Sequence, residues 1–253
     1  TGKHRQSEVT LKQSDRLMTS PSQAPPTSMR LQRRVAVSHQ CYSVTHYNGQ
    51  IYGAVSDGVD RVTSNGRSSR LISVDDIVWS VSVNDGVIYA LVFKSSDGWS
   101  VRVCDSDYHL IRSWRHNEGS EDLPYKNQLA VRKDSVLIPH RDSKTIIQYS
   151  LTGEVERRIP CPMLNGFYIW LCVVSSRPDS VIVSCDDTVS CIDMSTGDCV
   201  WYTHSLEEPT AICCDNADRV YVAIGGWSHT VQIAVLDGDT GKVSFTYQTH
   251  PYF

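Results

Sequence analysis

The stretch DGVIYALV (85–92) is a two-residue turn followed by a strand of β-branched and aromatic residues. The chain repeats this pattern at four other places: NGQIYGAV (48–55), KDSVLIPH (133–140), PDSVIVSC (178–185) and ADRVYVAI (217–224). The corresponding residues, which we call the anchors, are Ile51, Ile88, Val136, Val181 and Val220. They follow one another at intervals of 37, 48, 45 and 39 residues. The mean interval is about 42 residues, a period typical of repeat proteins.

A second landmark recurs in the same register. Downstream of each anchor lie a strand, a polar turn and another strand, and four of these turns carry a glycine: Gly66, Gly153, Gly197 and Gly241. In the second repeat we place Asp107 at the glycine position. Four strands per repeat predict an all-β chain, a β-propeller with five four-stranded blades at about 41–77, 78–122, 123–166, 167–208 and 209–253. A β-sandwich with similar strand spacing is the alternative.

Charge divides the chain into two parts. Residues 1–34 carry seven Lys or Arg and two acids, and they include SPSQAPPTS (20–28), a segment with nothing to bury. This composition predicts a flexible basic Ser/Pro-rich linker over 1–34 and a β-propeller over 35–253. The remaining 17 bases and 26 acids give the propeller a net charge of −9. A solvated linker is favoured over one that binds nucleic acid or acidic lipid.

Apolar and cysteine patterns bear on the compartment. The longest apolar runs are only a few residues, and the first residues contain no apolar signal segment. The nine cysteines form no C-x-x-C pair, and most lie in strand-like runs, which favours reduced, buried thiols over disulfides or a metal cage. We therefore expect a cytoplasmic protein without a membrane partner.

Motifs for catalysis and metal binding are missing from the sequence. The nine histidines form no H-E-x-x-H motif and no close His/Cys spacing, and no G-x-S-x-G element occurs. Four aspartates recur just after the second strands of the predicted blades: Asp57, Asp97, Asp142 and Asp187. They suggest a cation site or an acid/base pair, but capping of turn amides is favoured. We predict no catalytic residue, no metal and no cofactor, and we do not expect an enzyme.

The stretch IPHRDSKTIIQYSLTGEV (138–155) resembles the repeats of NHL-type propellers, although Ser143 and Thr145 stand where such repeats often carry Asn and Arg. IDMSTGDCVW (192–201) is similar to an element of quinoprotein-like propellers. Together with SVTHYNGQIYG (43–53) and the Ser/Pro-rich linker, residues 34–253 look like the C-terminal propeller of invertebrate tripartite-motif-like proteins. Such a propeller recognises partners or substrates behind a RING finger, B-boxes and a coiled coil. Any ubiquitin-ligase activity would belong to a longer parent.

The resemblance also bears on the number of blades. NHL-type relatives commonly close with six blades, whereas residues 41–253 supply five repeats of about 42 residues. We therefore favour a truncated six-bladed propeller, and hence a fragment, over a native five-bladed one.

The loops joining second to third strands and successive blades carry the candidate binding residues. They are Trp99, Tyr125, Lys126, His140, Arg141, Lys144, Trp227 and His229. Aromatic and Arg side chains on a rigid surface are typical of protein-binding hot spots, and they also stack single-stranded bases. The net charge of −9 favours a protein or peptide partner over RNA, which stays the alternative. The other tryptophans, Trp79, Trp114, Trp170 and Trp201, are expected in the core.

Overall fold

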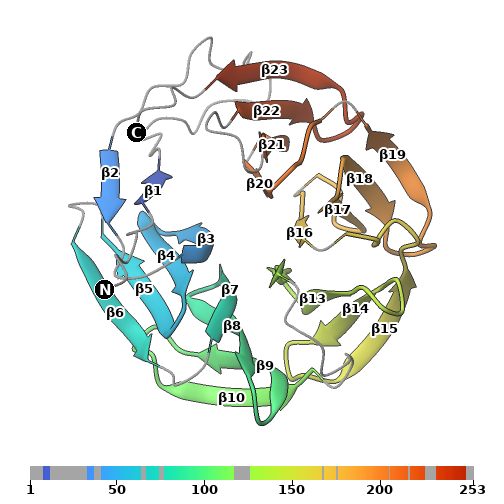
Figure 1. Ribbon diagram of the computed structural model, residues 1–253. Helices are drawn as coiled ribbons and strands as arrows, with labels where there is room; N and C mark the ends of the chain where they lie inside the picture. The colour runs from blue at the N-terminus through green and yellow to red at the C-terminus, as the bar shows by residue number, and fades with distance from the viewer. Residues whose placement is uncertain are drawn as a thin grey trace. The chain divides into compact units, whose positions relative to one another are not determined.

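The computed structural model describes residues 8–11, 33–36, 41–63, 67–73, 77–116, 126–166, 168–174, 176–204, 206–215, 217–225 and 232–248. Every regular element in these ranges is a β-strand. The strands form five four-stranded antiparallel blades of a β-propeller, so the predicted fold is confirmed (Figure 1). The described part of the chain contains no helix that could cross a membrane.

Each blade is a meander in which neighbouring strands of the sheet are consecutive in the sequence. Blades one and two contain β3 (Cys41–Tyr47), β4 (Gln50–Val55), β5 (Gly58–Val62), β6 (Ser68–Ser73), β7 (Ile77–Asn84), β8 (Val87–Lys94), β9 (Gly98–Cys104) and β10 (Leu110–Arg115). Blade three contains β12 (Ala130–Val131), β13 (Ser135–His140), β14 (Thr145–Ser150) and β15 (Val155–Pro160). A two-residue strand, β11 (Lys126–Asn127), precedes it.

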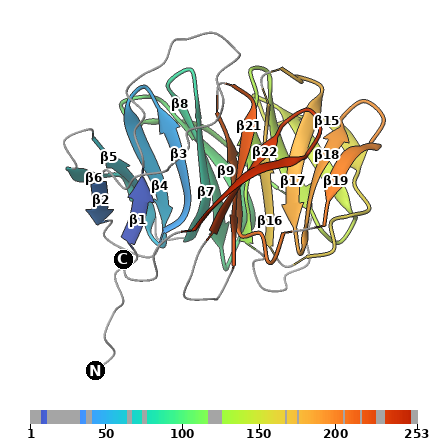
Figure 2. The same cartoon turned by 90° about the horizontal axis from the view of Figure 1, so that it is seen from above.

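Blades four and five follow the same order. They contain β16 (Tyr168–Cys172), β17 (Ser180–Cys185), β18 (Thr188–Asp193), β19 (Cys199–Thr203), β20 (Ala211–Cys214), β21 (Arg219–Ile224), β22 (Gln232–Asp237) and β23 (Val243–Gln248). Figure 2 shows the strands of blade four, β16 to β19, from another direction. All five anchors lie in the second strands of their blades, as the repeat predicts.

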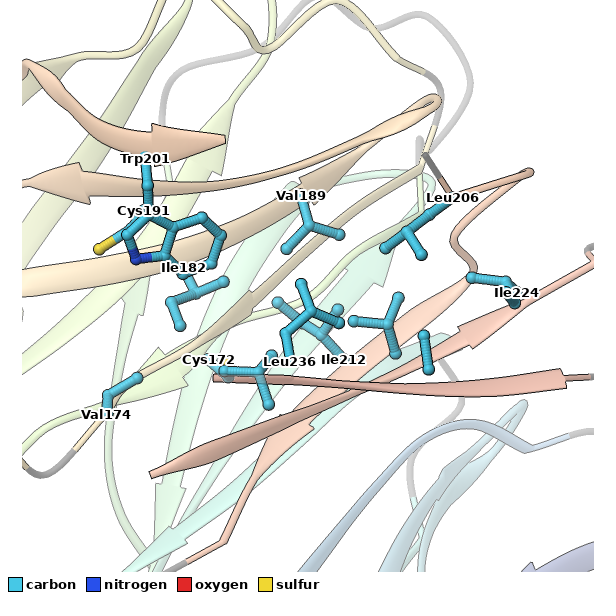
Figure 3. Close-up of a cluster of buried hydrophobic side chains, with 13 residues drawn as sticks. Cys172, Val174, Ile182, Val189, Cys191, Trp201, Leu206, Ile212, Ile224 and Leu236 are labelled. Carbon is cyan, nitrogen blue, oxygen red and sulfur yellow. The ribbon is translucent and has the colours of Figure 1, made fainter. Parts of the chain in front are cut away.

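The chain divides into two compact units, one holding blades one and two and the other holding blades four and five, while blade three contributes to both. In the first unit, apolar side chains of blades one and two share a core that includes Ala54, Val59, Ile88 and Ala90. In the second unit, blades four and five share a core that includes Ile182, Val189, Val220 and Leu236 (Figure 3). Burial of one such side chain contributes about 1.5–3 kcal/mol, which makes these cores the main source of stability.

The turns between third and fourth strands dock each blade on its neighbour. Gly153, Gly197 and Gly241 have positive φ angles of 96°, 83° and 68°. Backbone without a Cβ is needed here because an added Cβ would lie 2.6 Å from Trp114 Cγ at Gly153 and 2.7 Å from Trp201 Cδ2 at Gly241. Thus the tryptophan of one blade's fourth strand packs on the turn glycine of the next blade within the same unit.

The glycine register predicted for the second repeat is wrong by one residue. Tyr108, with φ of 71°, holds the left-handed position, and Asp107 does not. The Tyr108 hydroxyl accepts a 2.9 Å hydrogen bond from Arg61 Nη1 of blade one, which compensates for the strained backbone of a non-glycine residue. Gly66 lies outside the described residues.

Of the four tryptophans predicted to lie in the core, one is buried and three are half-buried. Trp201 is 9% exposed, and its Nε1 donates a 3.0 Å hydrogen bond to the Gly238 carbonyl. Trp79, Trp114 and Trp170 are only half-buried.

The N-terminal part contains one pair of strands that the sequence did not predict. β1 (Glu8–Leu11) pairs antiparallel with β2 (Arg33–Ala36), which crosses the predicted boundary at residue 34. The division into a linker over 1–34 and a propeller over 35–253 stays a prediction.

Candidate functional site: an aromatic cluster on blades one and two

Two β-bulges occur at matching places in the first strands of blades one and two. In β3, Cys41 pairs with Val55 and Ser43 pairs with Ala54, so that Tyr42 is the extra residue. In β7, Val78 pairs with Val92 and Ser80 pairs with Leu91, so that Trp79 is the extra residue. A bulge leaves one residue outside the ladder and redirects its side chain. The two bulges therefore aim two aromatic rings from equivalent positions.

The rings of Tyr42 and Trp79 meet at the end of the blades where second strands turn into third strands. Their centroids are 4.5 Å apart, with a 41° angle between the rings. Trp99 lies 6.4 Å from Trp79, and Phe93 lies 5.1 Å from Trp99. Phe93 and Trp99 are cross-strand partners on β8 and β9. We call Tyr42, Trp79, Phe93 and Trp99 the aromatic cluster; all four are half-buried, so part of each faces solvent.

Two buried polar atoms, one in the cluster and one on Gln128, lack a hydrogen-bond partner in the described part of the chain. Trp79 Nε1 is buried and makes no hydrogen bond within the described part of the chain. Gln128 Nε2 donates a 3.4 Å hydrogen bond to Ser43 Oγ, while Gln128 Oε1 is buried without a partner there. Ser80 Oγ accepts a 3.1 Å hydrogen bond from the Leu129 amide. A buried polar atom without a partner costs about 1–3 kcal/mol, so the site is less stable than a closed core.

The turn that leads into Trp99 carries charged groups. Asp97 Oδ2 lies 3.2 Å from Lys94 Nζ, and Asp97 Oδ1 lies 4.0 Å from Arg115 Nη2. The hydrogen bond and charge of Lys94 lower the pKa of Asp97, which keeps this carboxylate ionised. The Trp99 carbonyl accepts a 2.9 Å hydrogen bond from the His116 amide, which holds the start of β9. Ion pairs of Asp97 and a backbone hydrogen bond of Trp99 therefore hold the turn and the start of β9 next to the cluster.

The recurring aspartates do not share one role. Asp57 and Asp60 of blade one both pair with Arg70, at 2.9 and 2.6 Å, and Asp97 pairs with Lys94. Asp142 and Asp187 are exposed. Within the described ranges, no group of three His, Cys, Asp or Glu residues could hold a metal ion.

Aspartates at other positions also accept hydrogen bonds from turn amides. Asp193 Oδ1 accepts hydrogen bonds from the Ser195 and Thr196 amides, and Asp237 Oδ1 does the same for the Asp239 and Thr240 amides.

A second group of predicted residues shares the turn between β13 and β14, in the other unit. His140 Nδ1 lies 2.6 Å from Ser143 Oγ, and it also accepts a 3.2 Å hydrogen bond from the Ser143 amide. Because the imidazole nitrogen serves the turn amide as well as the hydroxyl, His140 caps the turn. Lys144, with φ of 49°, donates its amide to the Arg141 carbonyl at 2.9 Å. The turn presents Arg141 directly after His140 and Lys144 directly after Ser143.

The predicted residues therefore fall into three sets. Trp99 belongs to the aromatic cluster, and His140, Arg141 and Lys144 share one turn. Lys126 lies in β11, and its side chain is outside the described part. The other predicted residues, Tyr125, Trp227 and His229, also lie outside the described residues.

Tyr42, Phe93 and Trp79 were not among the site residues predicted from the sequence. A signal for two of them is present: YSV (42–44) and WSV (79–81) each begin nine residues before an anchor, Ile51 and Ile88. An aromatic residue followed by Ser-Val in the same register marks the bulge. Phe93 has no such signal, because only its pairing with Trp99 brings it to the cluster.

No protein-family model and no curated protein matches the chain. Solved structures do match its fold. A protein of unknown function from Bacteroides caccae matches at a TM-score of 0.68 and 13% identity, covering 88% of this chain and 87% of the other. Streptogramin B lyase matches at a TM-score of 0.61 and 10% identity, covering 86% of this chain and 73% of the other.

A computationally designed protein, Ika8, matches at a TM-score of 0.52 and 13% identity, covering 86% of this chain and 77% of the other. At these identities the likeness extends to the fold alone.

Proposed function

We propose that the chain is a partner-recognition module that binds a protein or peptide through the loop ends of its blades. The aromatic cluster carries this proposal. Half-buried aromatic rings on a rigid scaffold offer large contact area at low entropic cost, and they are enriched at binding hot spots. The same end of blades one and two holds buried polar atoms whose partners a ligand can supply.

The wider setting of the proposal is a tripartite-motif-like parent in the cytoplasm, with residues 1–34 as a linker. It rests on the resemblance of 34–253 to NHL-type propellers. The loop residues Tyr125, Lys126, His140, Arg141, Lys144, Trp227 and His229 are proposed as further contacts.

A protein partner is favoured over single-stranded RNA because of charge. Affinity for RNA comes largely from neutralising phosphates, whereas residues 35–253 carry a net charge of −9. Two bases of blade two, Lys94 and Arg115, share the carboxylate of Asp97. Arg141 and Lys144, on one turn, are the feature that favours RNA.

An enzyme is disfavoured. One fold relative is named a lyase, but the likeness of 10% identity carries no residues over. The His140–Ser143 pair has the spacing of a base and a nucleophile, yet the turn amide occupies the same imidazole nitrogen.

The test is quantitative capture from a cell extract with three forms of the chain. The double variant Tyr42→Ala with Trp99→Ala is expected to lose a specific protein that the wild type retains. The control is Tyr202→Ala, which removes a 58% exposed aromatic from the outer strand β19. Equal recovery by all three forms contradicts the proposal.

A second arm measures single-stranded RNA binding at low and high salt, with Arg141→Ala and Lys144→Ala as the variant. Salt-sensitive binding that this variant abolishes would replace the protein partner with RNA.

A further inference from the structure

From the aromatic cluster we infer the class of ligand: a proline-rich peptide segment in the polyproline II conformation. This inference rests on the proposed function and names the chemistry of its partner. It stands on the spacing of the rings and on the hydrogen-bonding groups that they present.

The surface that the rings form is short enough to be covered by one segment of such a peptide. The centroid of Trp79 lies 4.5 Å from that of Tyr42 and 6.4 Å from that of Trp99. Tyr42 and Trp99 are thus at most about 11 Å apart, and one polyproline II turn of three residues rises roughly 9 Å. A segment of one to two turns is therefore long enough to pack proline rings on all three aromatic rings. Phe93, 5.1 Å beyond Trp99, extends the surface at that end.

The two indole nitrogens of the cluster are donors only, while the Tyr42 hydroxyl can donate or accept. Trp79 Nε1 is buried without a partner in the described chain, and the Tyr42 hydroxyl and Trp99 Nε1 make no hydrogen bond with described residues. An indole nitrogen donates and does not accept. Proline-rich segments have the complementary chemistry, because proline has no amide N–H and its carbonyls carry no internal hydrogen bonds. An ordinary extended peptide brings a backbone donor at each residue, which the two indoles cannot accept.

The indole of Trp79 also explains why binding is favourable at this place. Its Nε1 is buried, so a ligand carbonyl reaches it only after a neighbouring side chain moves, and we assign this movement to the Tyr42 ring, whose centroid lies 4.5 Å from that of Trp79. After that movement the Trp79 indole N–H, which had no partner, donates a hydrogen bond to the ligand carbonyl. The bulged position of Tyr42, outside the ladder of β3, allows its side chain to move without breaking strand pairing.

The experiment measures binding of the peptide Ala-Pro-Pro, repeated to about four copies, to the whole chain by calorimetry. Intrinsic tryptophan fluorescence provides a second readout. Saturable binding is expected, together with binding at least 10-fold weaker for the same peptide with alanine in place of proline. Trp79→Phe and Trp99→Phe keep a ring and remove one donor, and each is expected to weaken binding about 3- to 10-fold. Trp170→Phe, a half-buried tryptophan of blade four, serves as the matched control and leaves binding unchanged.

Each outcome decides the inference. Absence of binding by the proline peptide, or equal binding of the alanine peptide, overturns it. Binding that Trp79→Phe and Trp99→Phe leave unaltered also overturns it, because the peptide then uses another surface. If the proline peptide fails but capture of a protein still depends on Tyr42 and Trp99, the proposed function stands and only its ligand class falls. Binding of single-stranded RNA in competition with the peptide would likewise reject this ligand.

Discussion

Replacing Gly241 with alanine tests how one blade docks on the next. Gly241 has φ of 68°, and a Cβ there would lie 2.7 Å from Trp201 Cδ2 and 2.9 Å from Trp201 Cζ3. The left-handed backbone alone costs alanine about 1–2 kcal/mol. Displacing a packed ring adds about 1–3 kcal/mol, and the indole is held in place by its 3.0 Å hydrogen bond to the Gly238 carbonyl.

We therefore expect Gly241→Ala to lower the free energy of unfolding by about 2–5 kcal/mol. Urea denaturation, followed by tryptophan fluorescence, measures this loss. The matched control is Gly49→Ala, where φ is 72° but nothing lies within 4 Å of an added Cβ. That control isolates the backbone contribution, about 1–2 kcal/mol. An equal loss for the two variants would refute the docking of Trp201 on Gly241.

Three further predictions concern single side chains. Burial raises the pKa of Asp215, but hydrogen bonds that it accepts from Arg219 and Tyr221 outweigh burial and lower the pKa. The ionised carboxylate therefore stabilises the fold above about pH 4, and this contribution is lost as the pH falls below about 4. Asp215→Asn should thus reduce the loss of unfolding free energy at acid pH, as urea denaturation over a pH series can measure. Burial raises the pKa of the Cys161 thiol to about 12, so iodoacetamide at about pH 8 should leave it unmodified in the folded chain, as mass spectrometry can check. The exposed 2.8 Å ion pair of Arg177 with Asp239 should contribute less than about 1 kcal/mol to the free energy of unfolding. Arg177→Ala should therefore barely lower the urea midpoint, and the shift should be smaller still at high salt.

The strands and their order could be predicted from the sequence because they depend on local pattern. In blade one the predicted turn and strand NGQIYGAV (48–55) contain β4, and the anchor Ile51 lies in β4 as expected. Alternation of apolar residues and turn chemistry decide these positions before any tertiary contact forms. The left-handed position in the second repeat was missed because Tyr108 holds it through a hydrogen bond from another blade, which local propensity does not report.

The aromatic cluster was predicted only in part, for a related reason. Trp99 was expected in a binding loop, whereas Trp79 was assigned to the core. A bulge is a shift of register between two strands, and it depends on how the blades pack as well as on the residue that bulges. The repeated Tyr-Ser-Val and Trp-Ser-Val elements signal it once the register is known. Pairing of Phe93 with Trp99 follows from the strand ladder alone.

We propose the aromatic cluster as the binding surface of the chain. Its most direct test is ¹⁹F spectroscopy of the chain with 5-fluorotryptophan at its six tryptophans, titrated with the protein recovered by capture. We expect the resonances of Trp79 and Trp99 to shift on binding, while those of Trp114 and Trp201, which pack on Gly153 and Gly241, stay in place. Unshifted resonances of Trp79 and Trp99 at saturation would contradict it.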